Sequence, residues 1–355
     1  MALRDDSGNL AIMKFGVGQP LRRMDDPVLL RGAGRFTDDI NLPRQAYAVM
    51  VRSPVAHGVI RGIDTAAAKA MPGVLAVYTG ADIQAAGYGT MKNIIAFGNR
   101  DGTPMRKPTR PSLAIDKVRF AGDPFACVIA ETPAQARDAA EAVTAEIDTL
   151  PAVTEARAAA QPAAPQLYHD VPNNLSLDYH YGDTAKVDAA FAAAAHVTRL
   201  GIINNRLVVA PMEPRSAIGE YDKTADRWTM HIGCQGVMGM RRQLAADILN
   251  VPPEKVRVLA GNVGGSFGMK AAVYPEYAGV LHGAKSLGRP VKWTDERSGS
   301  FVSDHHGRNH DLRGELALDK DGKFLAVRID GYVNVGAYLT PVTPLMGTLN
   351  VVKNT

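Results

Sequence analysis

The sequence predicts a mixed α/β (α+β) fold in two successive domains. Two strand–helix–strand units precede residue 150, an Ala/Pro-rich stretch follows, and a β-α-β-α-β run occupies residues 228–294. The 355 residues include 46% hydrophobic and 21% charged side chains, as expected of a globular protein with real cores. We expect a leader at 1–20, an α/β domain at 21–150, a linker at 151–173 and a second domain at 174–355.

The first domain is predicted from strand patterns and two helix starts. Thr65 is the expected N-cap of a helix that ends near residue 72. Thr132, Pro133 and Gln135 form a capping box that begins a second helix at 133–143. A Gly/Pro-rich segment at 84–112 is expected to be a long exposed loop. The strands are expected at 46–52, 59–64, 74–78, 126–130 and 145–150.

The second domain is predicted to alternate strands with helices and to end in a hairpin. An apolar face at helical spacing comprises Val237, Met240, Leu244, Ile248 and Leu249. The sequence DKDGK at 319–323 separates two strand-like runs and predicts a hairpin turn. Helices are expected at 186–195, from 237 to 249 and at 277–287, and strands at 196–203, 217–221, 228–232, 256–259, 290–294, 312–318 and 324–334.

The stretch Gly261–Lys270, GNVGGSFGMK, is the central candidate for a binding site. Its glycines let backbone N–H groups approach an anion, although a tight turn needing positive φ angles explains the glycines equally simply. The spacing fits neither GxGxxG nor GxxxxGK[ST]. The turn GCQG at 233–236 precedes it by one helix and one strand. If strands 228–232 and 256–259 are parallel neighbours, both turns lie at the sheet edge where ligands bind in open α/β sheets.

Other polar side chains allow more than one interpretation. Gln235 can donate and accept without adding charge, but a turn residue bonding its own backbone is the simpler alternative. In the loop Met212–Arg215, the Glu213 carboxylate and the Arg215 guanidinium predict a buried ion pair, with catalysis by Glu213 as the alternative. Cys127 is expected to be a small buried hydrophobe. The sequence around His305, His306 and His310 does not favour a metal site.

Charge and cysteine usage exclude several classes of protein. The 40 basic and 36 acidic residues are interspersed, so a nucleic-acid partner is not expected. The two cysteines form no CxxC motif and cannot build an iron–sulfur or zinc site, and they fit a reducing compartment. No apolar stretch resembles a signal peptide or a membrane span. We therefore predict a cytoplasmic protein.

The order GCQG, helix, NVP and GGSFG resembles the molybdenum hydroxylases, the xanthine dehydrogenase, aldehyde oxidase and aerobic carbon monoxide dehydrogenase family. RGAGRFTDDI, RSPVAHGVI and VRFAGDPFACVIAETPAQARDAAEAV resemble the family's N-terminal hammerhead domain. MEPRSAIGEYD and the final hairpin resemble its first molybdopterin-binding domain. The resemblance extends from about Leu21 to Tyr338, and the order and spacing of the motifs make it specific.

The resemblance implies a role for each matched residue. Gln235, beside Gly236, matches the glutamine whose amide meets an oxo ligand of molybdenum. Phe267 and Gly268 match the Phe-Gly that lies against the metal's ligands and the pterin dithiolene, and Gly264, Gly265 and Ser266 supply the close backbone. The metal is then held by the pterin and not by protein side chains. The implied cofactor is molybdenum-molybdopterin cytosine dinucleotide.

The implied protein is a large subunit that oxidises a small substrate, namely carbon monoxide, an aldehyde or an N-heterocycle, with oxygen from water. Electrons would then pass from this subunit to an Fe-S small subunit and an FAD medium subunit, in a dimer of heterotrimers. The family often reads GGGFGGKE, and the departures at Ser266, Met269 and Ala271 argue against xanthine as substrate.

The family's general-base glutamate and the copper-binding cysteine of true carbon monoxide dehydrogenases would lie beyond Thr355. The chain is therefore expected to be the N-terminal part of such a subunit, with an incomplete second domain and no activity alone. The alternatives are a truncated scaffold that only docks partner subunits and, with less support, a nucleotide-binding protein.

Overall fold

A mixed seven-stranded sheet joins the two halves of the chain in the computed structural model, which describes residues 23–348. The strand order is β13-β12-β11-β14-β1-β7-β3. The strands are β1 (Ala46–Arg52), β3 (Val74–Thr79), β7 (Pro124–Ala130), β11 (Ser216–Asp222), β12 (Arg227–Ile232), β13 (Val256–Leu259) and β14 (Val291–Thr294). The halves meet where β1 pairs in parallel with β14, with Ala46 opposite Val291. Both predicted domains thus contribute to one sheet, while the predicted leader lies outside the described residues.

Helix α8 (Pro275–Leu287) crosses this sheet and forms the centre of the core. Tyr277, Val280 and Leu281 on this helix are at most 1% exposed. A Cβ atom on Gly283 would come within 2.2 Å of Ile129 Cδ1, so a larger residue there would require the Ile129 side chain to shift. The helix begins two residues before the predicted start, because Pro275 occupies the first helical turn, where proline is favoured.

Helix α4 (Pro133–Glu141) packs against β1 and β7 and begins as predicted. The Thr132 hydroxyl accepts a hydrogen bond from the Gln135 backbone N–H at 3.2 Å. The other predicted N-cap, Thr65, does occupy the N-cap position of its helix, but its side chain makes no capping hydrogen bond, and the Asp64 carboxylate accepts the Ala66 N–H. Short helices α2 (Ala66–Ala70) and α3 (Gly80–Ala85) flank β3. A separate small sheet contains β6 (Lys117–Val118), β2 (Gly58–Asp64) and β8 (Thr144–Thr149).

Two segments differ from the sequence expectation. The predicted loop at 84–112 contains a two-stranded ladder of β4 (Thr90–Met91) and β5 (Arg110–Pro111), which is too short to show a periodic pattern. The helix predicted from 237 to 249 is α-helical only as α7 (Val237–Gln243) and continues as a π-helical turn at Leu244–Leu249. Backbone and side-chain donors of the 84–112 segment bind carbonyl groups of this turn, so tertiary contacts compete with the regular helical pattern.

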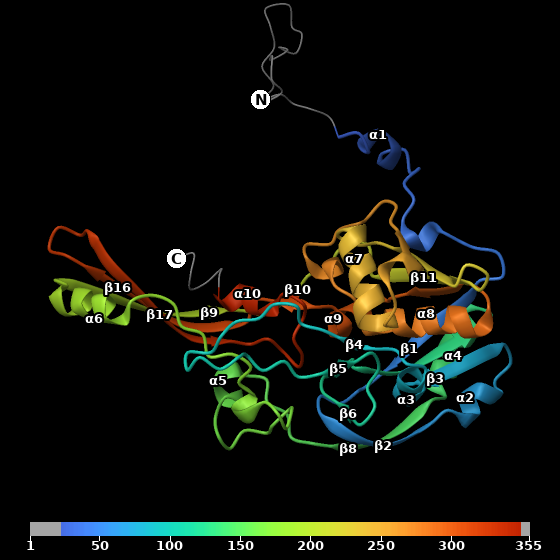
Figure 1. The fold of residues 1–355 in the computed structure, drawn as a ribbon, viewed down its shortest axis with the longest axis horizontal. Coiled ribbons are helices and arrows are strands. Elements are labelled where there is room, and N and C mark those ends of the chain that lie inside the picture. Colours follow the sequence, from blue (N-terminus) through green and yellow to red (C-terminus); the bar gives the residue numbers. More distant parts are fainter. Residues whose placement is uncertain (1–22, 349–355) are drawn as a thin grey trace, which may run out of the picture.

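A three-stranded sheet extends from the body as a long arm (Figure 1). Its order is β17-β16-β9, with β9 at His196–Asn204. The predicted hairpin is confirmed by β16 (His310–Leu318) and β17 (Phe324–Val333), whose turn is closed by the Asp319 carboxylate. The remaining elements are α1 (Asp26–Leu29), α5 (Ala156–Ala159), α6 (Thr184–Ala193), α9 (Arg297–Ser303), α10 (Thr343–Thr348), β10 (Leu207–Val208) and β15 (His306–Gly307).

Within residues 23–348, no helix combines the length and apolarity needed to cross a membrane.

Candidate functional site

Two glycine-containing turns lie at one edge of the seven-stranded sheet. Strands β12 and β13 are parallel neighbours, with Trp228 opposite Val256 and His231 opposite Leu259. Each strand runs directly into its turn, GCQG after β12 and GNVGGSFG after β13. The predicted juxtaposition of the two turns is therefore confirmed, and it follows from the parallel pairing of the strands.

The side chain of Gln235 ties the first turn to the second. Its Oε1 accepts hydrogen bonds from Ser266 Oγ at 2.7 Å and from the Gly268 N–H at 2.9 Å. The Gln235 backbone N–H donates to the Lys270 carbonyl at 3.1 Å. Because the Gly268 N–H can only donate, it fixes which amide atom faces the loop. The alternative in which Gln235 bonds its own turn is therefore wrong.

The Nε2 group of Gln235 is left for another acceptor. Among residues 23–348, no protein acceptor bonds to it, and Gln235 is exposed. The glycines beside it face open space, since a Cβ atom on Gly236 or Gly268 would meet no heavy atom within 4 Å. Both glycines have positive φ, +108° and +91°, a conformation that other residues adopt only with strain. The site thus presents an amide donor next to bare backbone.

Phe267 projects from the loop into solvent. Its side chain is 79% exposed, although it is the largest side chain in the stretch. Its φ is +51°, an unfavourable conformation for a bulky residue, and such strain is commonly retained at binding sites. The loop is held by Ser266, whose Oγ accepts the Lys270 N–H at 3.2 Å. The backbone conformation, and not packing against other side chains, therefore directs the Phe267 ring toward solvent.

A buried ion pair lies beneath the glycine loop. Lys270 Nζ is 2.7 Å from Glu213 Oε2 and 2.9 Å from the Glu213 carbonyl oxygen. The same carboxylate oxygen accepts the Gly264 N–H at 2.8 Å, and the Glu213 N–H donates to the Gly264 carbonyl. The Lys270 side chain is 1% exposed and that of Glu213 is 10% exposed. Glu213 therefore supports the loop from behind.

The sequence did not identify this support. Glu213 and Lys270 are separated by 57 positions, and no local spacing links them. The sequence showed only two separate features, namely Glu213 in a loop constrained by proline and Lys270 at the end of the glycine loop. A Cβ atom on Gly264 would lie 2.5 Å from Glu213 Cβ, so glycine is required for the two loops to approach.

The predicted ion pair between Glu213 and Arg215 is wrong. Arg215 is 1% exposed and donates instead to Glu276 at 2.9 Å and to Asp304 at 2.6 Å. Burial alone would raise the pKa of Glu276, but Arg215 and Arg52 hold it well below its usual range. Glu213 and Arg215 are therefore both paired, but with residues from distant segments that only the tertiary fold brings near them.

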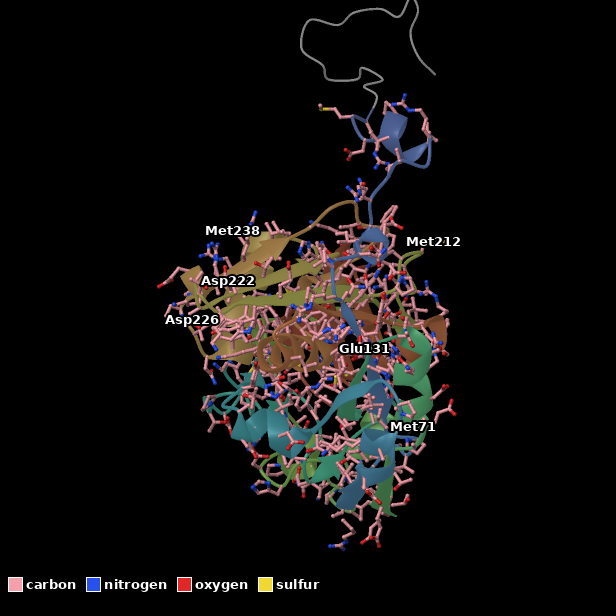
Figure 2. The ribbon with its side chains drawn as sticks, turned by 90° about the vertical axis from the view of Figure 1, so that its right-hand side faces the viewer. Met71, Glu131, Met212, Asp222, Asp226 and Met238 are labelled. Carbon is pink, nitrogen blue, oxygen red and sulfur yellow. The ribbon has the colours of Figure 1, made fainter. Side chains whose placement is uncertain are left out.

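The N-terminal segment lies against the start of the glycine loop. The Arg35 N–H donates to Asn262 Oδ1 at 2.8 Å, and the Asn262 N–H donates to the Arg35 carbonyl at 3.0 Å. A Cβ atom on Gly261 would be 2.6 Å from the Arg35 carbonyl oxygen. Figure 2 shows the exposed Met212 and Met238, which come from the loop before β11 and from α7, in the half of the body nearest α1.

Cys234 belongs to the first turn, directly before Gln235, whereas Cys127 lies in β7 and His305 follows α9. Cys127 is fully buried, which confirms its predicted role, and burial raises its pKa to about 12. Burial also raises the pKa of Cys234, which disfavours the reactive thiolate form. His305 stacks on Tyr274 with ring centroids 4.1 Å apart, and burial lowers its pKa well below the usual value. In the part of the chain that the structure describes, no three His, Cys, Asp or Glu residues form a potential metal site.

Each half of the chain matches the model of a known protein family. Residues 31–151 match the aldehyde oxidase and xanthine dehydrogenase a/b hammerhead domain. Residues 167–354 match the molybdopterin cofactor-binding domain. The chain belongs to the xanthine dehydrogenase and aldehyde oxidase family of molybdenum hydroxylase large subunits.

Individual molybdenum hydroxylases agree with this assignment. The nicotine 6-hydroxylase large subunit of Paenarthrobacter nicotinovorans is 34% identical over 92% of this chain and 39% of its own length. The carbon monoxide dehydrogenase large chain of Hydrogenophaga pseudoflava is 32% identical over 88% of this chain and 39% of its own. The reconstituted CO dehydrogenase of Oligotropha carboxidovorans superposes with a TM-score of 0.80 at 30% identity, over 88% of this chain and 39% of that one. The chain thus spans about two fifths of these molybdenum hydroxylase subunits.

Proposed function

We propose that this chain forms one wall of a molybdopterin site in a molybdenum-dependent oxidoreductase. The proposal rests chiefly on Gln235, whose Oε1 is held by Ser266 and Gly268 while its Nε2 is left for another acceptor. An amide held in this way can donate to an oxo group without adding charge. The residues of the wall are Gln235, Gly236, Gly264, Gly265, Ser266, Phe267 and Gly268.

The wall fits a large, flat and anionic group. Gly236 and Gly268 leave open space where side chains would stand, so a ligand can lie against the backbone. The exposed Phe267 ring offers an apolar surface beside that backbone. When bound, molybdopterin supplies the molybdenum centre that exchanges electrons and an oxygen atom with a substrate. The chain's own residues orient this group, and Glu213 with Lys270 keeps the loop in place.

The complete protein, in this proposal, oxidises a small carbon substrate with oxygen from water. The named relatives act on nicotine and carbon monoxide, and the hammerhead family that matches residues 31–151 includes aldehyde oxidase. The candidate substrate classes are therefore N-heterocycles, carbon monoxide and aldehydes. Ala271 has no side-chain donor or acceptor where the family often has glutamate, so we do not propose xanthine.

We further propose the cytosine dinucleotide form of the cofactor, and electron transfer to an Fe-S subunit and an FAD subunit in a dimer of heterotrimers. The free cysteines fit a cytoplasmic, reducing location.

The test is to measure molybdenum and pterin in the complete complex after purification. Stoichiometric molybdenum, with cytidine monophosphate released on hydrolysis of the cofactor, supports the proposal. An active preparation without molybdenum overturns it. A complex that contains both partner subunits but lacks cofactor and activity supports the scaffold alternative instead.

A further inference from the structure

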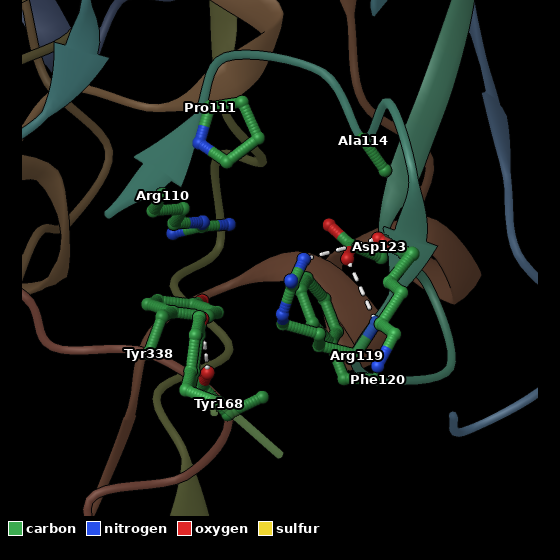
Figure 3. A pocket seen from close by; sticks show the side chains of 10 residues that line it. Arg110, Pro111, Ala114, Arg119, Phe120, Asp123, Tyr168 and Tyr338 are labelled. Carbon is green, nitrogen blue, oxygen red and sulfur yellow. Dashed lines mark hydrogen bonds between the residues drawn. The ribbon is translucent and has the colours of Figure 1, made fainter. Parts of the chain in front are cut away.

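A small hollow forms where three distant segments meet, well separated in sequence from the glycine loops. It is lined by residues 110–123, by Tyr168, and by Ala337 and Tyr338 after β17 (Figure 3). The hollow has about 260 Å³ of empty space, part of which is open to solvent. Its enclosed part has room for about one water-sized group. Nothing in the proposed cofactor site uses these residues.

Arg110 is a buried cation that forms no salt bridge within residues 23–348. The residue is 7% exposed, and its guanidinium carbon lies 3.3 Å from the centre of the Tyr338 ring and 5.6 Å from that of Phe120. Within residues 23–348, no carboxylate or carbonyl oxygen bonds to this guanidinium. Aromatic faces stabilise a cation only modestly, and an unpaired buried charge is costly. Arg110 is therefore poised to receive an anion.

A second guanidinium faces the same hollow. Arg119 lies over the Tyr168 ring at 4.7 Å, and its Nη1 donates to the Lys117 carbonyl at 3.2 Å. Its Nε is buried and has no hydrogen-bond partner among residues 23–348. The Tyr168 hydroxyl is already occupied, since it donates to the Ala337 carbonyl at 2.9 Å. The guanidinium groups of Arg110 and Arg119 thus both line the hollow, and each has N–H donors that bond to no acceptor within residues 23–348.

Asp123 is the acidic residue that lines the hollow, and within residues 23–348 it forms no salt bridge with Arg110, although the two charges attract each other. Its Oδ2 accepts the Arg119 backbone N–H at 3.0 Å. Figure 3 shows its carboxylate across the hollow from Arg110. Burial raises the pKa of Asp123 to about 6, although Arg110, Arg119 and Arg52 oppose this shift.

We propose that this hollow binds one small monovalent anion, a halide, between the guanidinium groups of Arg110 and Arg119. The enclosed part has room for about one water-sized group, and the two guanidinium groups beside the aromatic rings are the hydrogen-bond donors that an anion would meet there.

The Asp123 carboxylate makes this anion site sensitive to pH. Besides Asp123, the charged or titratable groups around the hollow are Arg110, Lys117, Arg119, Tyr168 and Tyr338, with Arg52 beyond Asp123 and the exposed Asp116 3.8 Å from Arg119. His305 packs behind Tyr338 with ring centroids 5.7 Å apart, and it stays neutral because burial holds its pKa well below the usual value. Burial raises the pKa of Tyr168 to about 12, so Tyr168 stays neutral. Ionised Asp123 repels an anion, and its protonation removes the repulsion. Anion affinity should therefore be about tenfold weaker at pH 7 than at pH 5.

The experiment uses bromide as the probe on the complete complex. Crystals soaked in sodium bromide at pH 5 should show an anomalous bromide peak between Arg110 and Arg119. The line width of the ³⁵Cl NMR signal, titrated with bromide, gives the affinity. Asp123→Asn should bind bromide as tightly at pH 7 as at pH 5, because its side chain cannot ionise. Arg110→Gln should lose the peak.

The matched control is Arg137→Gln, which removes the same charge from an exposed pair with Glu296. It should leave the bromide peak unchanged. The proposal is overturned if the unaltered protein shows only a water at this position at pH 5, or if Arg110→Gln retains the peak. Should Arg110→Gln fail to fold, Asp123→Asn decides alone, and a bromide affinity at pH 7 no tighter than that of the unaltered protein overturns the proposal.

Discussion

The carboxylate of Glu213 and the ammonium group of Lys270 lie 2.7 Å apart beneath the glycine loop, and the same carboxylate oxygen accepts the Gly264 N–H. The Glu213 side chain thus binds the loop on both sides of Phe267 and Gly268. The wall of the proposed cofactor site depends on an ion pair that does not itself face the open space.

Glu213→Gln should destabilise the protein by about 3 kcal/mol, because it leaves the Lys270 ammonium buried without a countercharge. Urea unfolding measures the change. Asp148→Asn, which breaks the exposed pair with Arg61, is the control and should cost less than about 1 kcal/mol. The double variant Glu213→Gln/Lys270→Met should be more stable than Glu213→Gln alone. Equal costs for the buried and exposed single variants would contradict the assigned role.

Gly264→Ala should destabilise the protein by about 1–3 kcal/mol, since the added methyl group meets Glu213 Cβ at 2.5 Å. Gly239→Ala is the matched control, because a Cβ there meets nothing within 4 Å and Gly239 lies inside helix α7. That control should be neutral or stabilising by up to about 1 kcal/mol. Thermal unfolding of both variants tests the comparison, which fails if Gly264→Ala is as stable as Gly239→Ala.

Gln235→Glu should keep the loop folded and retain molybdenum, because a carboxylate oxygen still accepts from Ser266 and Gly268. It replaces the Nε2 donor with an acceptor, so turnover of the complete complex should fall by about 10²-fold or more. Gln84→Glu, on the exposed surface of α3, provides a control with the same charge change. Normal turnover in Gln235→Glu would remove the basis for the proposed donor.

The burial of Asp123 predicts a decrease in stability as pH rises. Its folded pKa of about 6 is above the usual 3.8, so the folded state binds more protons between these values. This contribution is complete below about pH 4 and is lost as pH rises through 6. Relative to Asp123→Asn, the free energy of unfolding of the unaltered protein should fall by up to about 2 kcal/mol between pH 4 and pH 7, after allowing for the solvent that reaches the carboxylate.

Chemical unfolding at pH 4, 5, 6 and 7, without added halide, measures this difference. The comparison with Asp123→Asn cancels the opposite pH dependence of carboxylates such as Glu276, whose pKa is lowered. A constant difference across the range would contradict the prediction.

Much of the site could be predicted from the chain because the information is local. The glycines at 236, 264, 265 and 268 and the strands before each turn can be identified in short windows. Helix α4 and the hairpin of β16 and β17 were predicted for the same reason, since capping and turn residues act on their immediate neighbours. Thr65 occupies the predicted N-cap position, but the side-chain acceptor for the Ala66 N–H is Asp64, one position earlier.

The sequence by itself determined the fold class, the family and the two turns that form the candidate wall. The tertiary structure decided the partners of Glu213 and Arg215, the contact of Arg35 with Asn262, and the union of both halves in one sheet. It also placed Arg110 against the ring of Tyr338, with no salt bridge to any residue in the described part of the chain. Ion pairs and close backbone contacts between distant segments depend on which surfaces the packed sheet brings together, and no local pattern encodes that choice.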